Sequence, residues 1–290
     1  MLDYQALTAL AEIIRRGSFD AAAAALGITP SAVSQRIRSL EERLGQVLIH
    51  RGPPATGTEI GLRLMQHLDQ VRLLESTLDA GLRPQTGPAM LRLAVNADSL
   101  ATWFPPVMQA LAVLYDLVVD DQDHAREWLR RGEVAAAISS VADPVPGCDV
   151  HALGHMRYLA LATPEFVTRH FAQGLTEASL SRAPAIIFNM KDAAQARWAQ
   201  LATGRRLHPT GHTIPSSEAF ARAVELGLGW GMVPETMAQP ALDQGRLVPL
   251  LPDLPLDIPL YWHVQRAMAP ALAPLTAAIR QKAAAELLRP

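Results

Sequence analysis

The stretch from Ser18 to Arg51, SFDAAAAALGITPSAVSQRIRSLEERLGQVLIHR, decides how the first part of the chain folds. Its first half is rich in alanine, begins at Ser18, whose hydroxyl can cap free amides, and ends at Gly27, which tolerates a positive φ. Its second half opens with Thr29 as a cap and Pro30 at the first helical position, where no amide hydrogen is missed. The pattern predicts two short helices joined by a glycine turn, which is typical of a helix-turn-helix.

The second predicted helix has a surface suited to DNA. Val33, Ile37 and Leu40 recur at helical spacing and mark its buried side, and no acid occurs before Glu41 to repel phosphates. Gln can pair with adenine, Arg with guanine, and Ser with bases or phosphates, although an ordinary helical pair can carry the same residues. The residues predicted to contact DNA are Pro30, Ser31, Ala32, Ser34, Gln35, Arg36, Arg38, Arg51 and Thr58, the last three through the DNA backbone.

The residues on either side complete a small winged domain. Apolar residues recur at helical spacing from Leu2 to Arg16, with Asp3 as a cap, and predict a helix that packs behind the helix-turn-helix. The Pro/Gly-rich run from Gly52 to Gly57 predicts a hairpin, or wing, that lies along the DNA backbone or minor groove. Arg51 stands at the root of this wing.

A long apolar repeat follows the wing. The segment from Thr58 to Leu82 has no proline and predicts one helix capped by Thr58, with apolar residues at Ile60, Leu64, Leu68, Val71, Leu74 and Leu78. This stripe is longer than the small domain can cover, which favours pairing with a second copy of the chain. The alternative is that the helix folds back on its own chain. Residues 83–89, RPQTGPA, predict a linker.

From Met90 onward strands alternate with helices, which predicts a parallel sheet with helices on both faces. Strands are predicted at residues 90–95, 117–119, 134–138, 156–162, 185–188, 213–214, 230–233 and 258–264. Helices are predicted at residues 99–114, with a break near Pro105, and at 124–131, 164–171, 192–201, 217–226 and 270–288.

Polar and acidic residues follow several of these strands, at the edge where α/β sheets bind ligands. The positions are Asp98, Ser99, Asp121, Ser216, Ser217 and Glu218. Amides at a helix start suit a carboxylate and acids suit a cation, so together they suit a zwitterion with an extra positive charge. Each acid alone is also what a helix cap requires, but their recurrence at comparable strand ends favours a site. Phe188 is predicted to cover the ligand's methylenes or, equally, to lie in the core.

The composition of the 290-residue chain limits its function. It is 49% hydrophobic and 19% charged, lacks an apolar run of bilayer length, and begins with MLDYQAL, which is unlike a signal peptide. A single cysteine, Cys148, fits a reducing cytoplasm. The formal net charge of −2 means that a DNA-binding surface must be a local cluster of basic residues. We expect DNA binding by this cluster to depend steeply on salt concentration. No metal site, cofactor or catalytic residue is predicted, because neither histidine spacing nor a hydrolase motif supports one.

Several motifs resemble a known family. The N-terminal signature of LysR-type transcriptional regulators resembles this chain at Ser18–Phe19, Ala22–Ala23, Leu26, residues 30–35 (PSAVSQ), Ile37, Leu40–Glu41 and Leu44–Gly45. The segments AVNADSLATWFP, LRRGEVAAAIS, SSEAF and LYWH resemble the ArgP or LysG branch, also called IciA (inhibitor of chromosome initiation). This branch regulates basic amino acid export and metabolism. The resemblance implies a winged helix-turn-helix, a dimerising linker helix and a two-lobed, periplasmic-binding-protein-like α/β effector domain.

The resemblance also implies a site and partners. The residues carried over onto the effector site are Asp98, Ser99, Thr102, Trp103, Ser216, Ser217 and Glu218. The implied effector is L-lysine or L-arginine, and the partners are double-stranded promoter DNA, RNA polymerase and other copies of the chain, as a homodimer and a dimer of dimers. A cytoplasmic regulator that controls an amino acid exporter or a related metabolic gene is the resulting expectation. A second hypothesis is a protein that binds a replication origin and inhibits chromosome initiation.

The predicted domain boundaries follow from these elements. Residues 1–58 form the winged helix-turn-helix, 59–89 the dimerising helix and hinge, and 90–290 the effector domain. Within the effector domain, lobe I comprises residues 90–161 and 265–290, and lobe II comprises residues 162–264.

Overall fold

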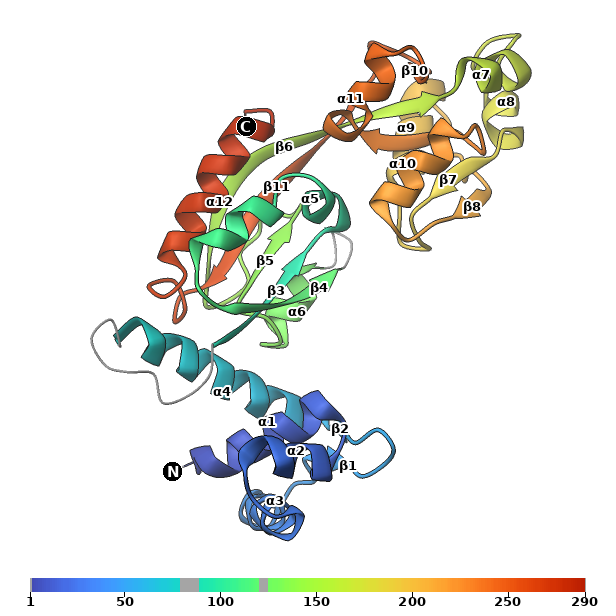
Figure 1. Ribbon diagram of the computed structural model, residues 1–290. Helices are drawn as coiled ribbons and strands as arrows, with labels where there is room; N and C mark the ends of the chain where they lie inside the picture. The colour runs from blue at the N-terminus through green and yellow to red at the C-terminus, as the bar shows by residue number, and fades with distance from the viewer. Residues whose placement is uncertain (1, 79–88, 120–124, 290) are drawn as a thin grey trace.

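The computed structural model describes residues 2–78, 89–119 and 125–289, and Figure 1 shows how its elements are arranged. The chain begins with three helices, α1 (Tyr4–Arg16), α2 (Phe19–Leu26) and α3 (Pro30–Leu44). Asp3 caps α1 and Thr29 caps α3 through their side-chain oxygens, as the sequence predicts. The helix-turn-helix prediction is confirmed.

One face of each helix forms the core of this small domain. Its buried side chains include Leu7, Leu10, Ile13, Ala22, Val33, Ile37 and Leu40. The wing is an antiparallel pair of short strands, β1 (Ile49–His50) and β2 (Thr56–Gly57). Gly17 has a φ of 66°, and a Cβ at this position would lie 2.8 Å from Cβ of Pro54. Glycine therefore allows both the turn after α1 and the close approach of the wing.

The long helix α4 (Glu59–Leu78) follows the wing, and Thr58 caps it by accepting from the amide of Gly61 at 3.1 Å. Its apolar side is covered in two places within the chain, since Leu68 is buried in the core of the small domain and Leu73 in the core of the sheet. Contacts within the same chain thus cover part of the apolar surface of α4. Residues 79–82 of the predicted helix and 83–88 of the predicted linker lie outside the described residues.

A mixed seven-stranded sheet lies at the centre of the second half of the chain. The strand order is β10 (Val248–Pro249), β6 (Cys148–Ala162), β11 (Leu256–Gln265), β5 (Ala136–Ser139), β3 (Met90–Val95) and β4 (Leu114–Val119), with β9 (Gly231–Pro234) also paired to β6. Strand β3 is parallel to β4 and β5, but β11 is antiparallel to β5 and β6. The prediction of a parallel sheet is wrong for the long strands, because one leads out of lobe I and the other returns.

Helices cover both faces of this sheet, as predicted. The C-terminal helix α12 (Ala273–Glu286) packs in the same core as Leu93 of β3. On the opposite face α6 (Ala125–Arg130) buries Leu129 beside Ala94 of β3. Neighbouring residues of β3 thus point to opposite sides, as a strand requires.

The long strands β6 and β11 lead from lobe I into a second lobe, visible at the upper right of Figure 1. This lobe contains a parallel pair, β7 (Ala185–Ile187) and β8 (Gly211–Thr213). Its helices are α7 (Pro164–His170), α8 (Glu177–Arg182), α9 (Ala194–Thr203), α10 (Ser217–Glu225) and α11 (Glu235–Asp243). Helices α8 and α11 were missing from the sequence prediction, since the first has six residues and the second contains a proline.

The predicted helix over residues 99–114 does break near Pro105, as expected, but its extent is wrong. Helix α5 (Ala97–Ala101) has only five residues, and a 3₁₀ helix, η1 (Pro105–Ala110), follows it. Leu114 already begins strand β4. Two adjacent prolines interrupt the helical pattern here, because proline lacks an amide hydrogen and clashes with the preceding turn. None of the helices in the described parts of the chain could span a membrane.

Candidate DNA-binding surface and ligand cleft

Helix α3 presents the face predicted to contact DNA. Its exposed members are Pro30, Ser31, Gln35 and Arg38, and its half-buried members are Ala32, Ser34 and Arg36. Val33, Ile37 and Leu40 are buried on the opposite side and anchor the helix to α1 and α2. The sequence therefore predicted correctly which side of α3 faces solvent.

Two further residues predicted to contact DNA have partners inside the chain. The guanidinium of Arg51 lies 3.4 Å from a carboxylate oxygen of Glu41 and 5.6 Å from the ring centre of Phe19. Its side chain remains about half exposed at the root of the wing. The hydroxyl of Thr58 donates to the carbonyl of Val47 at 2.9 Å and also caps α4. Thr58 thus has a structural role, whereas Arg51 keeps an exposed cationic group.

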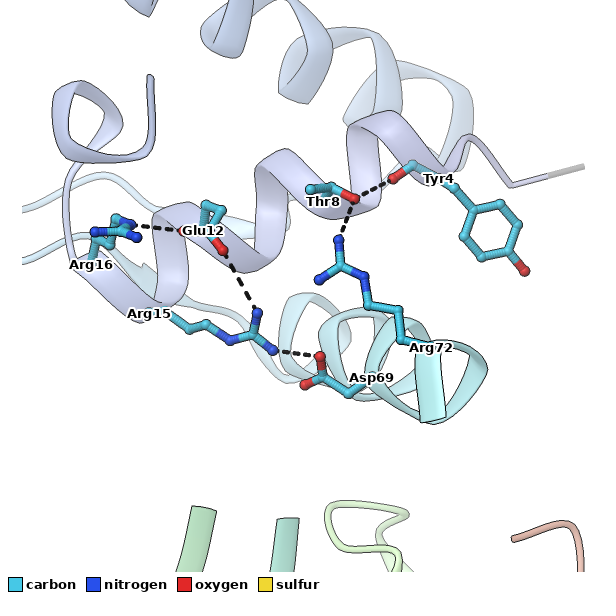
Figure 2. A network of polar contacts seen from close by, with 7 residues as sticks. All are labelled: Tyr4, Thr8, Glu12, Arg15, Arg16, Asp69 and Arg72. Atoms are coloured by element: carbon cyan, nitrogen blue, oxygen red, sulfur yellow. Dashed lines mark hydrogen bonds and ion pairs between the residues drawn. The ribbon is translucent and has the colours of Figure 1, made fainter. Parts of the chain in front are cut away.

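A polar network joins α1 to α4 (Figure 2). Arg15 donates a short hydrogen bond to Asp69, and Arg72 donates to the hydroxyl of Thr8 at 2.9 Å. Burial raises the pKa of the Asp69 carboxyl, although the hydrogen bond and the charge of Arg15 act in the opposite direction. The long helix is therefore attached to the small domain by charged groups as well as by apolar packing.

A cleft lies between the two lobes, and its empty space, including the part that is open solvent, is about 550 Å³. Its lining comes from α5, from the long strands, and from the region of β9, α9 and α10 in the second lobe. The lining residues are Ala97, Asp98, Tyr158, Phe188, Asp192, Ala194, Gln195, Ser217, Phe220, Met232, Pro234 and Ile258. Two of them are acids and none is a base, and the aromatic and apolar members can contact aliphatic groups.

Asp98 links the two lobes across this cleft. One of its carboxylate oxygens accepts from the hydroxyl of Tyr158 on β6 and the other from the hydroxyl of Ser217 on α10, both at 2.6 Å. Burial raises the pKa of the Asp98 carboxyl, while the hydrogen bonds from Ser217 and Tyr158 lower it and the charge of Asp192 raises it further. A cation in the cleft would favour the ionised form of this carboxyl.

Asp192, just before α9, and Gln195, in its first turn, form the opposite wall. The carboxylate of Asp192 accepts from the amides of Phe188 at 2.9 Å and Ala194 at 3.0 Å. The side-chain amide of Gln195 is 3% exposed and donates from Nε2 to the carbonyl of Ile186 at 2.8 Å. Its Oε1 has no hydrogen-bond partner among the described residues.

The structure brings some of the predicted effector residues together and separates others. Asp98, Phe188 and Ser217 line the cleft. Ser216 caps α10, Glu218 points to solvent, Ser99 and Trp103 are buried, and Thr102 donates to the backbone oxygen of Asp98. Asp121 lies outside the described residues.

Sequence reasoning missed Asp192, Gln195 and Tyr158. Asp192 does follow the strand that ends near Phe188, which is a signal for a site, but the sequence pattern there predicts only the start of a helix. Tyr158 lies on the buried side of β6, between Met156 and Ala160, so its position in the sequence resembles that of an ordinary core residue. Gln195 lies in an ordinary helical sequence, and no local pattern indicates that it lines a cleft.

A winged helix-turn-helix, a long helix and a two-lobed domain with a polar cleft together define a DNA-binding regulator with a ligand-binding domain. The family model described as "Bacterial regulatory helix-turn-helix protein, lysR family" matches residues 4–62, and the model "LysR substrate binding domain" matches residues 84–284. The chain belongs to the LysR family of transcriptional regulators.

Three similar proteins identify the branch. ArgP of Pseudomonas fluorescens is 45% identical over 284 residues, which is 95% of this chain and 94% of that protein. The crystal structure of ArgP from Mycobacterium tuberculosis superposes with a TM-score of 0.82 at 42% identity and covers 100% of this chain and 99% of that one. The structure of full-length LysG from Corynebacterium glutamicum with bound effector Arg gives a TM-score of 0.69 at 38% identity and covers 100% of both chains. The chain lies in the ArgP/LysG branch.

Proposed function

We propose that this regulator binds promoter DNA through α3 and the wing, and that a basic amino acid in the interlobe cleft controls it. The observation that carries the effector class is the charge of the cleft: Asp98 and Asp192 line it, and no described lining residue is a base. Two acids in a partly desolvated site favour a cation, because its charge compensates both. Phe188 and Phe220 add apolar walls for a methylene chain.

Similarity supports the same effector class, since the Corynebacterium glutamicum LysG structure contains Arg as its effector. Asp98 of lobe I accepts from Ser217 of the second lobe and from Tyr158 on the long strand β6. A cation that binds Asp98 and Asp192 would act on these interlobe contacts and shift the population of lobe arrangements. The proposed readout is a change in DNA bending by an oligomer that contacts RNA polymerase, in the cytoplasm, at an exporter or metabolic gene.

Calorimetry with the full-length chain tests the effector class. L-arginine and L-lysine are expected to bind, whereas L-leucine and L-glutamate are not. Binding of only the neutral or acidic amino acids would overturn the proposal.

A genome-wide occupancy map separates promoter regulation from binding at a replication origin. We expect peaks upstream of amino acid export or metabolic genes. A single peak at the origin would favour the second hypothesis.

A further inference from the structure

We propose that Gln195 determines specificity in the cleft by accepting a hydrogen bond, through Oε1, from the guanidinium of a bound arginine. This inference rests on the proposed function and names a residue that selects between arginine and lysine. It starts from a buried acceptor that lacks a partner within a site lined by acids.

The orientation of the Gln195 amide follows from its donor. The carbonyl of Ile186 can only accept a hydrogen bond, so the nitrogen of the amide must face it, at 2.8 Å. Oε1 is then directed away from Ile186. The side chain is 3% exposed, so bulk water does not satisfy this oxygen. A buried acceptor without a partner costs free energy that a ligand donor can recover.

The neighbours of Gln195 define the ligand group that it meets. Asp192 lies three positions earlier, just before the N-cap of α9, and its side chain lines the same cleft as Gln195. Asp98 lines the same cleft from α5 in the other lobe. The site therefore offers acceptors from two lobes and, in its described lining, no competing cation.

A guanidinium fits this arrangement better than an ammonium. It is planar and carries five N–H donors directed along two edges, so it can reach carboxylates on one side and an amide oxygen on another. An ammonium concentrates three donors at one point. Arginine should therefore gain more than lysine from the Gln195 oxygen.

Two substitutions separate the acceptor role from a structural one. Gln195→Met removes both the acceptor and the donor to Ile186, whereas Gln195→Glu removes the donor but keeps an acceptor. Gln200→Met is the matched control, because Gln200 is exposed on the same helix and does not line the cleft. Calorimetry with L-arginine and L-lysine, and thermal melting without ligand, are measured for all three full-length variants.

We expect Gln195→Met to weaken arginine binding by about tenfold or more and lysine binding by about threefold or less. Gln195→Glu should lose no more than about threefold in arginine affinity even if its melting temperature falls, because it keeps an acceptor and its added negative charge favours a cation; Gln200→Met should match wild type. Unchanged arginine binding in Gln195→Met overturns the inference. Equal loss of arginine in the Met and Glu variants also overturns it, because the side chain would then act only through Ile186.

Failure of the proposed function and failure of the role of Gln195 give different experimental results. If the wild-type chain binds neither basic amino acid, the proposed function fails and the role of Gln195 with it. If the wild type binds arginine and Gln195→Met binds it equally well, only the role of Gln195 fails.

Discussion

The surface of α3 carries positive charges that face solvent, whereas the interlobe cleft carries negative charges that lie between the two lobes. On α3, Arg36 and Arg38 lie on a face open to solvent, and in the cleft Asp98 and Asp192 lie between two lobes. Salt screens exposed charges beyond about 10 Å at 0.1 M, whereas buried charges are screened much less. The chain should therefore bind DNA through many salt-sensitive contacts and its effector through a few contacts that salt hardly changes.

A change in salt concentration should give the largest difference between the two regions, because it should weaken DNA binding far more than effector binding. Raising the salt concentration from about 50 to about 200 mM should weaken promoter binding by about a thousandfold or more if the oligomer makes six or more phosphate contacts. The affinity for L-arginine should change by less than about threefold over the same range. Fluorescence anisotropy with labelled DNA and calorimetry with arginine measure the two slopes. Equal slopes would mean that the cleft charges are as exposed as those of α3.

Removing one cleft charge should give the next largest effect. Asp98→Asn should weaken L-arginine binding by about a hundredfold, because a cation loses a charged hydrogen-bond partner in a desolvated site. Its melting temperature should stay close to that of wild type, because asparagine keeps the shape and removes a carboxyl that burial penalises, which offsets the loss of one of the two hydrogen bonds that Asp98 accepts.

Glu218→Gln is the matched control for Asp98→Asn. Glu218 is one residue from Ser217 but exposed and outside the cleft lining, so arginine binding should stay within about twofold. Equal losses in the two variants would contradict the geometry of the site.

The difference between the two regions also explains what the sequence could predict. The helix-turn-helix depends on local features: Thr29 caps α3, and Val33 and Ile37 repeat at helical spacing over one continuous segment. Such features can be recognised without knowing what lies far away in the chain. The caps, the helices and the exposed face of α3 were therefore predicted correctly.

The cleft combines residues from position 97 to position 258, so its geometry depends on long-range packing. Asp98 was predicted because it directly follows a strand. Glu218 was predicted beside Ser217, but each helical residue turns by about 100°, so Ser217 faces the cleft and Glu218 faces solvent. The role of Gln195 depends on where Ile186 presents its carbonyl, which no local pattern reveals.

On the DNA side, a single base-contacting residue should have a moderate effect. Gln35→Ala should cost about 1–3 kcal/mol on the specific promoter site and little on random DNA, because Gln35 is exposed on the reading face. Anisotropy with both DNAs checks the difference. Arg38→Ala offers the contrast, with a similar loss on both DNAs and a smaller salt slope. Equal losses of Gln35→Ala on both DNAs would remove Gln35 from base reading.

The smallest predicted effect is the response of effector binding to pH. Burial raises the pKa of Asp98 above 3.8, and a bound cation favours its ionised form, so arginine affinity should fall as pH drops toward that raised value. We expect a progressive loss of arginine affinity in the wild type as pH is lowered from neutrality toward that raised pKa, and a flatter profile in Asp98→Asn. Calorimetry across this range provides the test, and identical profiles would exclude Asp98 as the titrating group.

The raised pKa of Asp98 changes the stability of the fold with pH in the opposite direction from effector binding. A raised pKa means that the folded chain holds its proton more tightly than the unfolded chain. The stability contributed by Asp98 is therefore fully present below pH 3.8 and is lost as pH rises through the folded-state pKa. Lowering the pH thus weakens effector binding through Asp98, whereas it increases the stability that Asp98 contributes to the fold.

The most direct measurement compares L-arginine with L-citrulline, which has nearly the same shape but a neutral urea group in place of the guanidinium. Calorimetry with the full-length chain at neutral pH would show whether the acid-lined cleft recognises the charge. We expect L-arginine to bind about a hundredfold more tightly than L-citrulline. Equal affinities would contradict the claim that Asp98 and Asp192 select a cationic effector.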